Sequence, residues 1–478
     1  MRLMISRQVF LRGAAGALAT SALFTSTRAR ADPAGGWSSL ASAIGGQVLL
    51  PTDPAFAGRK QVFNSVYNGS TPAAVVVASS QADVEKAVAF AAANKLKIAP
   101  RGGGHSYTGA STATGAMVLD LRGMPGGVHV DNAAGTVTVP AATDLFSVHQ
   151  GLAAAGRAIP AGSCPTVGTA GLTLGGGLGA DSRRAGLTCD ALRSATVVLP
   201  SGQTVTASAQ DNPDLFWALR GGGGGNFGVT TSLTFATFPV GACDVVRVDF
   251  PTSAGAQALT GWQAWLAAAD RDTWGLVDLS VNGTEGNCHV LATCPAGSGA
   301  TVAQDIASAV GVQPTAIERK TLSRMELVTY LAGGSSTNSP RGFVAGSDVI
   351  GTMNSAAAQA IVDAIGKWPP GGGAAAVILD TIGGAVSDVD PAGTAFPWRR
   401  QSAVAQWYVQ TGNGQTSTAS TWVATAHQTV KEHSVGGYVN YLESNMSAAR
   451  YFGSNLPRLS AVRRQYDPAG LMYSGLSF

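Results

Sequence analysis

A histidine at the rim of a glycine run is the first feature of this sequence that suggests chemistry. Residues 101–106 read Arg-Gly-Gly-Gly-His-Ser and follow a β-rich stretch. Glycines let a backbone approach a ligand closely and turn its amide hydrogens inward, and such a nest binds anions, notably a diphosphate. His105 would then act as a base, a ligand or an attachment point. On these residues alone, a flexible loop beside a surface histidine is the simpler interpretation.

A second glycine-rich stretch, residues 162–179, contains Cys164. Two glycine triplets, one completed by Ala180 and one by Gly228, match the spacing of the dinucleotide-binding fingerprint. That fingerprint requires a strand before the glycines and a helix after them. The run Val229–Phe235 is β-branched and predicts a strand, and no acidic residue lies suitably beyond it. We therefore reject a nicotinamide-binding Rossmann domain.

The elements that must position these loops alternate with glycine clusters between about Ala73 and Phe238. β-branched content with flanking turns predicts strands, and apolar spacing of three and four predicts helices. The predicted strands are Ala74–Val77, Met117–Leu121, Thr136–Val139 and Ala195–Leu199, and the predicted helices are Gln81–Asn94 and Asp144–Ala155. Together they predict a mixed α+β domain.

A second region, from about Pro239 to Lys431, follows this domain. Its predicted strands are Asp244–Phe250 and Ala374–Asp380, and its predicted helices are Ala256–Ala268 and Ser355–Lys367. The last forty-odd residues regain aromatic and arginine content, with a helical pattern over Leu456–Gln465. We place the boundaries at residues 1–31 (export signal), 32–238 (first domain, core 70–238), 239–431 (second domain) and 432–478 (a segment that returns to the first domain).

Length and composition limit the class of protein. A chain of 478 residues is too long for one ordinary core, and its 12 % of charged residues is about half the usual share. This favours a large, well-buried globular protein over a disordered one. The net charge of +3 includes no basic run, so nucleic acid is not expected as a partner.

The N-terminus predicts an export signal. Arg2, Arg7 and Arg12 form a positive region, Gly13–Phe24 is apolar, and residues 29–31 offer a small-x-small cleavage site. The apolar stretch is too short to span a bilayer. The residues around Arg7 resemble a twin-arginine signal with Gln8 in place of the second arginine. We expect an exported protein, by the twin-arginine route.

Five cysteines follow the signal, and an odd count in an exported chain leaves one thiol to explain. Cys288 and Cys294 lie close enough in sequence for a local disulfide, and Cys189 with Cys243 is a second option. No spacing resembles a zinc site, and we expect no metal.

The order of the motifs resembles the berberine-bridge-enzyme-like branch of the FAD-linked oxidases, which have a vanillyl-alcohol-oxidase fold. The matching segments are residues 101–107, 162–179, 214–220 with the five glycines and Asn226–Val229 that follow, 438–441, 451–453, 458–459 and 466–468. The resemblance covers nearly all of the mature chain. It implies an α+β fold with a PCMH-type FAD-binding domain of two subdomains and an α+β substrate domain with an antiparallel sheet.

The resemblance also implies FAD held by two covalent bonds. In this branch the histidine of the first loop bonds the 8α carbon of the flavin, and the cysteine before Pro-Thr-Val-Gly bonds its C6. These residues are His105 and Cys164, as in the bicovalent oligosaccharide oxidases and aclacinomycin oxidoreductase, and the second bond would explain the odd thiol. The full set implied to contact FAD is Arg101, Gly102, Gly103, Gly104, His105, Ser106, Tyr107, Cys164, Val167, Gly168, Gly171, Gly175, Gly177, Gly179, Asn226, Gly228 and Val229.

The same resemblance implies that a tyrosine of the Tyr-x-Asn-Tyr segment removes the proton from a substrate hydroxyl. Tyr438 and Tyr441 both match, and the sequence leaves the choice open. An ordinary tyrosine has a pKa near 10, so the base needs a neighbour that supports it. The candidates are Asp380 and Gln406 with Tyr408, each on a predicted strand.

Two further positions matter in the resemblance. A valine three residues after the cysteine, here Val167, leaves room for dioxygen and favours oxidase over dehydrogenase behaviour. The family's C-terminal Asn-x-Phe flavin contact is replaced by Gly470–Met472, so this edge of the FAD site must be held differently.

We therefore expect a secreted oxidase that takes hydride from an alcohol or sugar hydroxyl, with O2 as acceptor and hydrogen peroxide as product. The alternatives are a tailoring oxidase acting on a glycosylated metabolite and a weakly active flavin-binding protein. Trp398, Trp407 and Trp422 would stack on sugars or pack in the core, and tryptophans in a β-rich domain more often pack. The substrate and the oligomeric state remain open.

Overall fold

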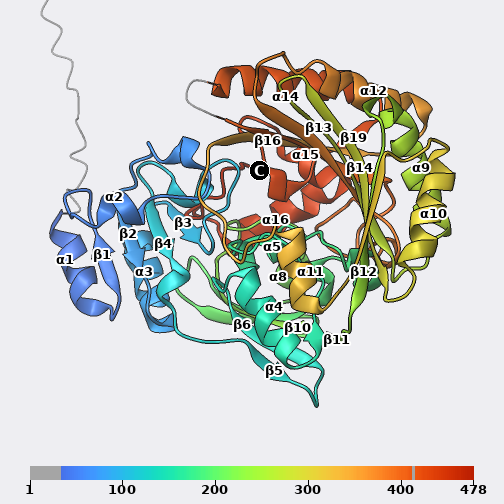
Figure 1. Ribbon diagram of the computed structural model, residues 1–478. Helices are drawn as coiled ribbons and strands as arrows, with labels where there is room; N and C mark the ends of the chain where they lie inside the picture. Colours follow the sequence, from blue (N-terminus) through green and yellow to red (C-terminus); the bar gives the residue numbers. More distant parts are fainter. Residues whose placement is uncertain (1–33, 412–414) are drawn as a thin grey trace, which may run out of the picture.

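The computed structural model describes residues 34–411 and 415–478, which form two α+β lobes, as expected, and a C-terminal segment that returns to the first lobe (Figure 1). The first lobe carries a four-stranded and a five-stranded sheet, and the second carries an eight-stranded sheet. The residues of the predicted export signal lie outside the described part of the chain. In the part that is described, no helix has the length and apolarity needed to cross a bilayer.

The four-stranded sheet has the order β1 (Gln47–Leu49), β2 (Ala74–Val77), β4 (Met117–Asp120), β3 (Ile98–Arg101). β2, β4 and β3 run parallel, and nearly every residue of these strands is buried. Strands buried on both faces require continuous apolar runs, which explains the Ala-Val-Val-Val sequence of β2. Helix α3 (Gln81–Ala93) begins where the Ser80 side chain accepts a hydrogen bond from the amide of Asp83. β3 ends directly at the loop that carries His105.

The five-stranded sheet is antiparallel, in the order β5 (His129–Asp131), β6 (Thr136–Pro140), β10 (Val229–Ala236), β8 (Leu192–Val198), β9 (Thr204–Ser208). Helices α4 (Leu145–Ala154), α5 (Thr169–Leu174) and α8 (Pro213–Leu219) belong to the same lobe. The Asp144 side chain caps α4 by accepting from the Ser147 amide. β10 directly follows the glycines of residues 221–228, as a strand and not a helix, which agrees with the rejection of a Rossmann unit.

The eight-stranded sheet of the second lobe is antiparallel and has the order β15-β12-β14-β13-β17-β18-β16-β19. Its strands are β12 (Cys243–Asp249), β13 (Trp274–Asn282), β14 (Glu285–Pro295), β15 (Ala316–Leu322), β16 (Phe343–Ile350), β17 (Ala374–Thr381), β18 (Ala403–Gln410) and β19 (Ser434–Gly436). Helices α9 (Gly255–Ala268), α10 (Gly299–Val310), α12 (Ser355–Gly366) and α14 (Thr416–Val430) cover its outer face (Figure 1).

Side chains along β17 alternate between the packed core on one face of the sheet and the cavity on the other. Val377 and Leu379 are fully buried beneath the helices, whereas Ile378 and Asp380 face a cavity on the other side. A strand with one packed and one open face requires this period of two. Trp407 and Trp422 belong to the packed core, and Trp398 is buried elsewhere, donating to the Gly437 carbonyl; none of the three lines the cavity.

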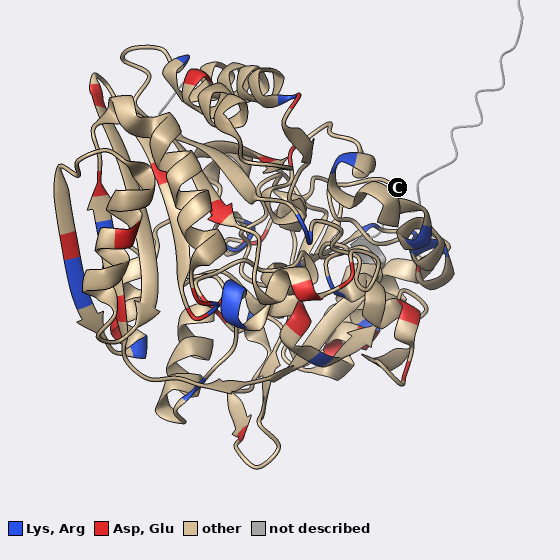
Figure 2. Cartoon of the chain, turned by 90° about the vertical axis from the view of Figure 1, so that its right-hand side faces the viewer, with Lys and Arg blue, Asp and Glu red and all other residues tan. Residues whose placement is uncertain are grey.

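The C-terminal segment returns to the first lobe through α15 (Ala448–Phe452) and α16 (Leu456–Tyr466). Leu459 and Phe452 join the core cluster that contains α8, and the guanidinium of Arg458 lies 4.2 Å above the Trp217 ring. The remaining helices and short strands are α1 (Ala34–Ala43), α2 (Phe56–Arg59), α6 (Ser182–Ala185), α7 (Thr188–Ala191), α11 (Arg324–Leu331), α13 (Ala385–Asp388), β7 (Arg157–Ala158) and β11 (Phe238–Pro239). Charges of both signs are interspersed over the face seen in Figure 2.

The expected disulfides are wrong, because all five cysteines are free. Cys288 and Cys294 lie six residues apart on the single strand β14, which separates them by about 20 Å at 3.3 Å per residue. A disulfide requires Cα atoms closer than about 7 Å. Cys189 is buried in a cluster with Leu187, Val349 and Val404, whereas Cys243 begins β12 in the second lobe.

Candidate active site

A cavity of about 600 Å³ lies between the glycine loops of the first lobe and the open face of the eight-stranded sheet. Its volume is in the range of sites that hold small molecules and cofactors. The wall from the first lobe includes residues 102–107, Cys164, Val167, Gly168 and Gly171, and the opposite wall includes Asp380, Gln406 and Tyr441. Residues predicted from four separate motifs therefore meet at one cavity.

Two glycines bring the His105 and Cys164 loops together. A Cβ on Gly103 would lie 2.3 Å from the Gly168 amide nitrogen, and a Cβ on Gly168 would lie 2.2 Å from that of Gly103. The two backbones are thus in direct contact, and any side chain at either position would separate them. The contact places His105 and Cys164 on the same wall.

His105 is held with one ring nitrogen committed. Its Nε2 lies 3.0 Å from the Thr166 hydroxyl, and its ring stacks on Phe63 at 4.0 Å between centroids. Burial lowers the pKa of His105 to about 4, so the imidazole is neutral near pH 7. In this neutral ring Nε2 contacts Thr166, and Nδ1 is the nitrogen outside that contact.

Cys164 accepts a hydrogen bond of 3.2 Å from the side-chain amide of Asn338. Burial raises the pKa of the thiol, while Asn338, Thr166 and Arg341 oppose this rise. Asn338 and Arg341 come from the segment between α11 and β16, in the second lobe. Sequence reasoning missed both, because they stand in a polar loop that matches none of the motifs.

The remaining glycines fit a bound diphosphate in part. Gly171 and Gly224 line the cavity, and a Cβ on Gly171 would meet no atom within 4 Å, so glycine there keeps the space open. Asn226 donates to the Gly222 and Gly223 carbonyls, while its buried Oδ1 has no partner among the described residues. A buried acceptor of this kind points to a ligand that donates a hydrogen bond. These features fit FAD.

Several predicted FAD contacts lie behind the wall instead, and this corrects the expectation for Arg101, Gly175, Gly177 and Val229, none of which lines the cavity. Gly175 and Gly177 are glycine because a Cβ would lie 2.0 Å from the Asn440 Oδ1 and 2.2 Å from the Thr188 Oγ1, respectively. Val229 is fully buried in the core of the five-stranded sheet.

Gly179 and Gly228 do line the cavity, yet protein backbone explains why they are glycine. A Cβ on Gly179 would lie 2.0 Å from the Ala161 carbonyl oxygen, and a Cβ on Gly228 would lie 2.8 Å from that of Val198. Neither position therefore needs a bound flavin to exclude a side chain.

Arg101 is a structural residue beneath the His105 loop. Its fully buried guanidinium donates to the carbonyls of Ser111, Arg59 and Lys60, and lies 3.8 Å from the Asp120 carboxylate. Asp120 also pairs with Arg59 and Arg122. All three guanidinium nitrogens thus donate to protein acceptors, and the group does not face the cavity.

The structure separates the two candidate tyrosines. Tyr438 is buried, and its hydroxyl oxygen accepts from the Gly177 amide and the Asn440 side chain, both at 2.8 Å. Tyr441 lines the cavity, packs its ring against the edge of Tyr438, and stacks on Tyr107 at 5.2 Å between centroids. Tyr441 is therefore the tyrosine that can meet a substrate, and Tyr438 supports it.

Asp380 and Gln406 enter the cavity from neighbouring strands. β17 and β18 pair in a register that sets Ile378 opposite Gln406, so Asp380 lies one step along the same face. Burial raises the pKa of Asp380 to about 6, and its charge contributes to the raised pKa of Tyr441. Gln406 instead donates to the Tyr107 hydroxyl. The charge of Asp380 thus acts on Tyr441, whereas the side-chain amide of Gln406 is hydrogen-bonded to Tyr107.

Comparisons with known proteins agree with this geometry. Residues 72–208 match the FAD binding domain family, and residues 437–475 match the family of berberine and berberine-like segments. The chain therefore combines an FAD binding domain with a berberine-like C-terminal segment, and it resembles the berberine-bridge-enzyme-like FAD-linked oxidoreductases.

Three relatives illustrate the similarity. An uncharacterized FAD-linked oxidoreductase of Bacillus subtilis is 29 % identical over 88 % of this chain and 94 % of its own, and a chitooligosaccharide oxidase of Gibberella zeae is 29 % identical over 89 % and 91 %. A solved glucooligosaccharide oxidase from Acremonium strictum, described with a 6-S-cysteinyl, 8α-N1-histidyl FAD, superposes with a TM-score of 0.82 at 25 % identity over 91 % and 97 %.

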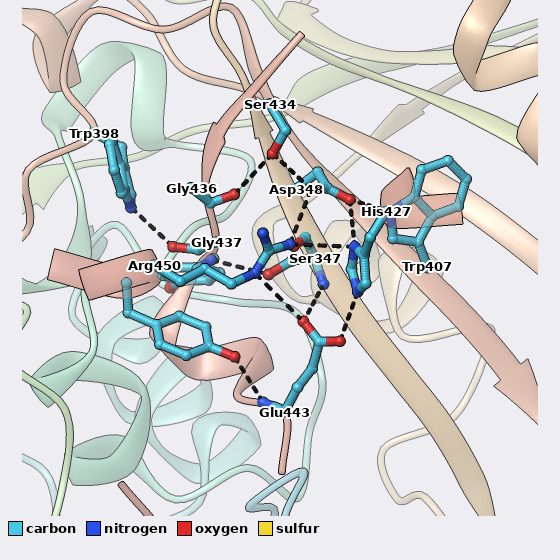
Figure 3. A network of polar contacts seen from close by, with 12 residues as sticks. Ser347, Asp348, Trp398, Trp407, His427, Ser434, Gly436, Gly437, Glu443 and Arg450 are labelled. Atoms are coloured by element: carbon cyan, nitrogen blue, oxygen red, sulfur yellow. Dashed lines mark hydrogen bonds and ion pairs between the residues drawn. The ribbon is translucent and has the colours of Figure 1, made fainter. Parts of the chain in front are cut away.

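In this berberine-bridge-like oxidoreductase a buried charge network holds the segment that carries Tyr441 (Figure 3). His427 of α14 lies between Asp348 of β16 at 2.6 Å and Glu443 at 2.7 Å. Arg450 contributes a second cation, 2.9 Å from Asp348. The two carboxylates raise the pKa of His427 to about 9, so the imidazolium persists at neutral pH. Because Glu443 follows Tyr441 by two residues, the network fixes that segment against the sheet.

The edge where the family's Asn-x-Phe contact is missing is held through Asp467. Its carboxylate accepts from the amides of Leu471 and Met472, and the Tyr473 amide donates to the carbonyl of Ile98. Tyr473, Ser474 and Leu476 then line the cavity. A backbone anchor on β3 thus replaces the side chains that the family pattern supplies.

Proposed function

We propose that this oxidoreductase carries FAD bonded to His105 and Cys164 and oxidises a sugar hydroxyl, with O2 as the acceptor and hydrogen peroxide as product. The observation that carries the proposal is the placement of His105 and Cys164 on one wall of the cavity that Tyr441 and Asp380 face from another. When bound, the flavin accepts hydride and passes two electrons to O2. Gly171, Gly224 and Asn226 would hold the rest of the cofactor.

The protein's own residues would manage the proton. The Tyr441 oxygen receives the proton of the substrate hydroxyl as hydride leaves the carbon. Burial raises the pKa of Tyr441 well above 10, so its phenol can accept the substrate proton only if its own proton passes to a neighbouring acceptor. Asp380, with its pKa near 6, is ionised at neutral pH and takes up the phenolic proton. A positioned base of this kind contributes about 10²- to 10⁴-fold in rate.

Polar lining supports a polyhydroxylated substrate. Asp380, Gln406 and Tyr408 face the main cavity, and Tyr408 also lines an adjoining cleft of about 290 Å³ with Asn287 and Gln410. Hydroxyl, amide and carboxylate groups along one sheet face offer both donors and acceptors for sugar hydroxyls. The names of the oligosaccharide oxidases to which the chain is similar agree with this substrate class.

Val167 supports the oxidase assignment, because it follows Cys164 by three residues and its small side chain lines the cavity. Export through the N-terminal signal is part of the same proposal, and it would place the enzyme where sugars are met and peroxide is released outside the cell. Covalent attachment would prevent loss of the flavin there.

The proposal is tested by mixing the purified protein with mono- and oligosaccharides under anaerobic conditions. We expect sugars to bleach the flavin absorbance, and peroxide to appear when O2 is admitted. Tyr441→Phe serves as the matched control, since it retains the ring that stacks on Tyr107 but lacks the oxygen. If a broad panel of sugars bleaches neither protein while a non-sugar alcohol bleaches the wild type, the sugar assignment is refuted and the enzyme is an oxidase of other alcohols.

A further inference from the structure

A segment of the second lobe, residues 332–342 between α11 and β16, lies against the two residues proposed to bond the flavin. Its end is tied to the first lobe by backbone. The Arg341 amide donates to the Phe63 carbonyl, and the Ser65 amide donates to the Arg341 carbonyl, each at 3.0 Å. The Asn64 side chain adds two hydrogen bonds to the backbone of Phe343. The segment is therefore fastened to the first lobe and held in place.

Two side chains of this segment reach the covalent edge of the cavity. Asn338 donates to the Cys164 sulfur at 3.2 Å. The Arg341 guanidinium lies 5.6 Å above the ring of Phe63, which stacks on His105 and also contacts Phe343. Among the described residues Arg341 forms no ion pair, so its charge is not neutralised by a carboxylate partner. Its charge favours the thiolate form of Cys164.

The two attachment residues differ in where their partners come from. His105 is held by Phe63 and Thr166, which both belong to the first lobe. Cys164 is held partly by Thr166 and partly by Asn338, which belongs to the second lobe. The direct contacts of His105 thus lie within one lobe, and Arg341 acts on it only by lowering its pKa, which keeps the imidazole neutral; the direct contacts of Cys164 come from both lobes.

We propose that Asn338 and Arg341 are positioning residues for the bond between Cys164 and the flavin, and that this bond closes only when the second lobe has docked. The inference rests on the bicovalent cofactor of the proposed function but not on its substrate. Asn338 would orient the sulfur, and Arg341 would supply the charge that favours its thiolate. The bond from His105 would form without either residue.

The reaction balances with O2 as oxidant. The S–H bond of Cys164 and the C6–H bond of the flavin break, and one S–C6 bond forms. The two protons and two electrons released go to O2, which becomes hydrogen peroxide. Because the thiolate is the nucleophile, the rate follows the fraction of Cys164 that is ionised.

The titratable groups that act on this thiol are Arg341 and three tyrosines, Tyr107, Tyr408 and Tyr441. The pKa of each tyrosine is raised above 10, mainly by burial. Between pH 7 and pH 9 the thiol is therefore the group of this set whose ionisation responds. Raising the pH should compensate for a lost hydrogen bond or a lost cation, which a loss of folding would not allow.

The experiment uses full-length holoprotein of the wild type, Asn338→Ala, Arg341→Ala and Arg341→Lys. Thr337→Ala, an exposed neighbour in the same segment, is the matched control. Protein purified at pH 7 and after incubation with FAD and air at pH 9 is denatured, treated with iodoacetamide and digested. Mass spectrometry then gives the fraction of Cys164 that is alkylated and the fraction of His105 peptide that carries flavin.

We expect complete attachment at both residues in the wild type and in Thr337→Ala. Asn338→Ala and Arg341→Ala should keep the flavin on His105 while Cys164 attaches about tenfold more slowly at pH 7, the effect of one pKa unit, with recovery at pH 9. Arg341→Lys should resemble the wild type. Cys164 attachment at the wild-type rate in both alanine variants overturns the inference, as does loss of flavin from both residues together. A freely alkylated Cys164 in the wild type overturns the bicovalent cofactor itself, whatever sugars the enzyme oxidises.

Discussion

Asp380→Asn should reduce activity while stabilising the folded protein, because the same buried carboxylate is both the proposed proton acceptor and an unfavourable charge. Burial raises its pKa from 3.8 to about 6. An acid whose folded-state pKa lies above its unfolded value contributes stability that is present below about pH 4 and is lost as the pH rises through 6. At pH 7 the ionised group therefore costs about 3 kcal/mol, the equivalent of about two pKa units.

The amide avoids this cost, so the variant should gain that free energy of unfolding at pH 7 and almost none at pH 4. With about 2.1 cal/mol/K of unfolding entropy per residue over 478 residues, the gain corresponds to about 3 °C in Tm. Differential scanning calorimetry of both proteins across this pH range measures it. Asp363→Asn, at an exposed position on α12, controls for the loss of one surface charge.

The activity measurement runs in the opposite direction. Since Asp380 must be ionised to accept the proton of Tyr441, the wild-type kcat/KM should rise as the pH increases through about 6. Asp380→Asn should lack this limb and fall by about 10²- to 10⁴-fold at pH 7, with the flavin still attached. An equal Tm for variant and wild type at both pH values, or a variant that keeps the wild-type pH profile, would refute the reasoning.

Four further substitutions test other parts of the site. Tyr441→Phe should lower the rate of anaerobic flavin reduction by about 10²- to 10⁴-fold. Tyr438→Phe should chiefly lower the unfolding free energy, by about 1–3 kcal/mol, because it removes the acceptor for two buried donors. Comparable losses of reduction rate in both variants would contradict the assignment of Tyr441. The raised pKa of His427 predicts a contribution to the unfolding free energy of about 3 kcal/mol, which is complete below about pH 6.5 and is lost as the pH rises through 9. The Tm measured from pH 6 to 10 should therefore fall more steeply in the wild type than in His427→Gln. Asp120→Asn should lower the unfolding free energy by about 3–5 kcal/mol, since it removes the carboxylate that neutralises the buried Arg101. The flavin should stay on His105, as measured by the fluorescence of the protein band on a denaturing gel. Loss of flavin without loss of stability would restore a cofactor role for Arg101.

Local sequence predicted many elements closely. The strand Ala74–Val77 has the predicted bounds, and the helix at 81–94 ends one residue early, because each follows from a short run whose neighbours in sequence decide it. The strand around Gln406 and Tyr408 was predicted, whereas β13, β14, β16, α10 and α14 were not, since small and polar residues interrupt their apolar patterns. The local disulfide between Cys288 and Cys294 was predicted wrongly, because residues six positions apart in one extended strand lie far apart in space.

The sequence by itself determined the parts of the site that reside in short motifs. The glycine run before His105, the cysteine of the second run and the Tyr-x-Asn-Tyr segment require particular residue types at fixed spacing, and these are readable without coordinates. Tertiary structure alone decided which of those residues face the cavity. Arg101 and Tyr438 belong to motifs yet point into buried hydrogen-bonding networks. Asn338 and Arg341 belong to none, yet Asn338 contacts Cys164 and Arg341 lines the same cavity. The direction of a side chain depends on the packing of strands and loops far apart in the chain, and a local pattern contains no information about that packing.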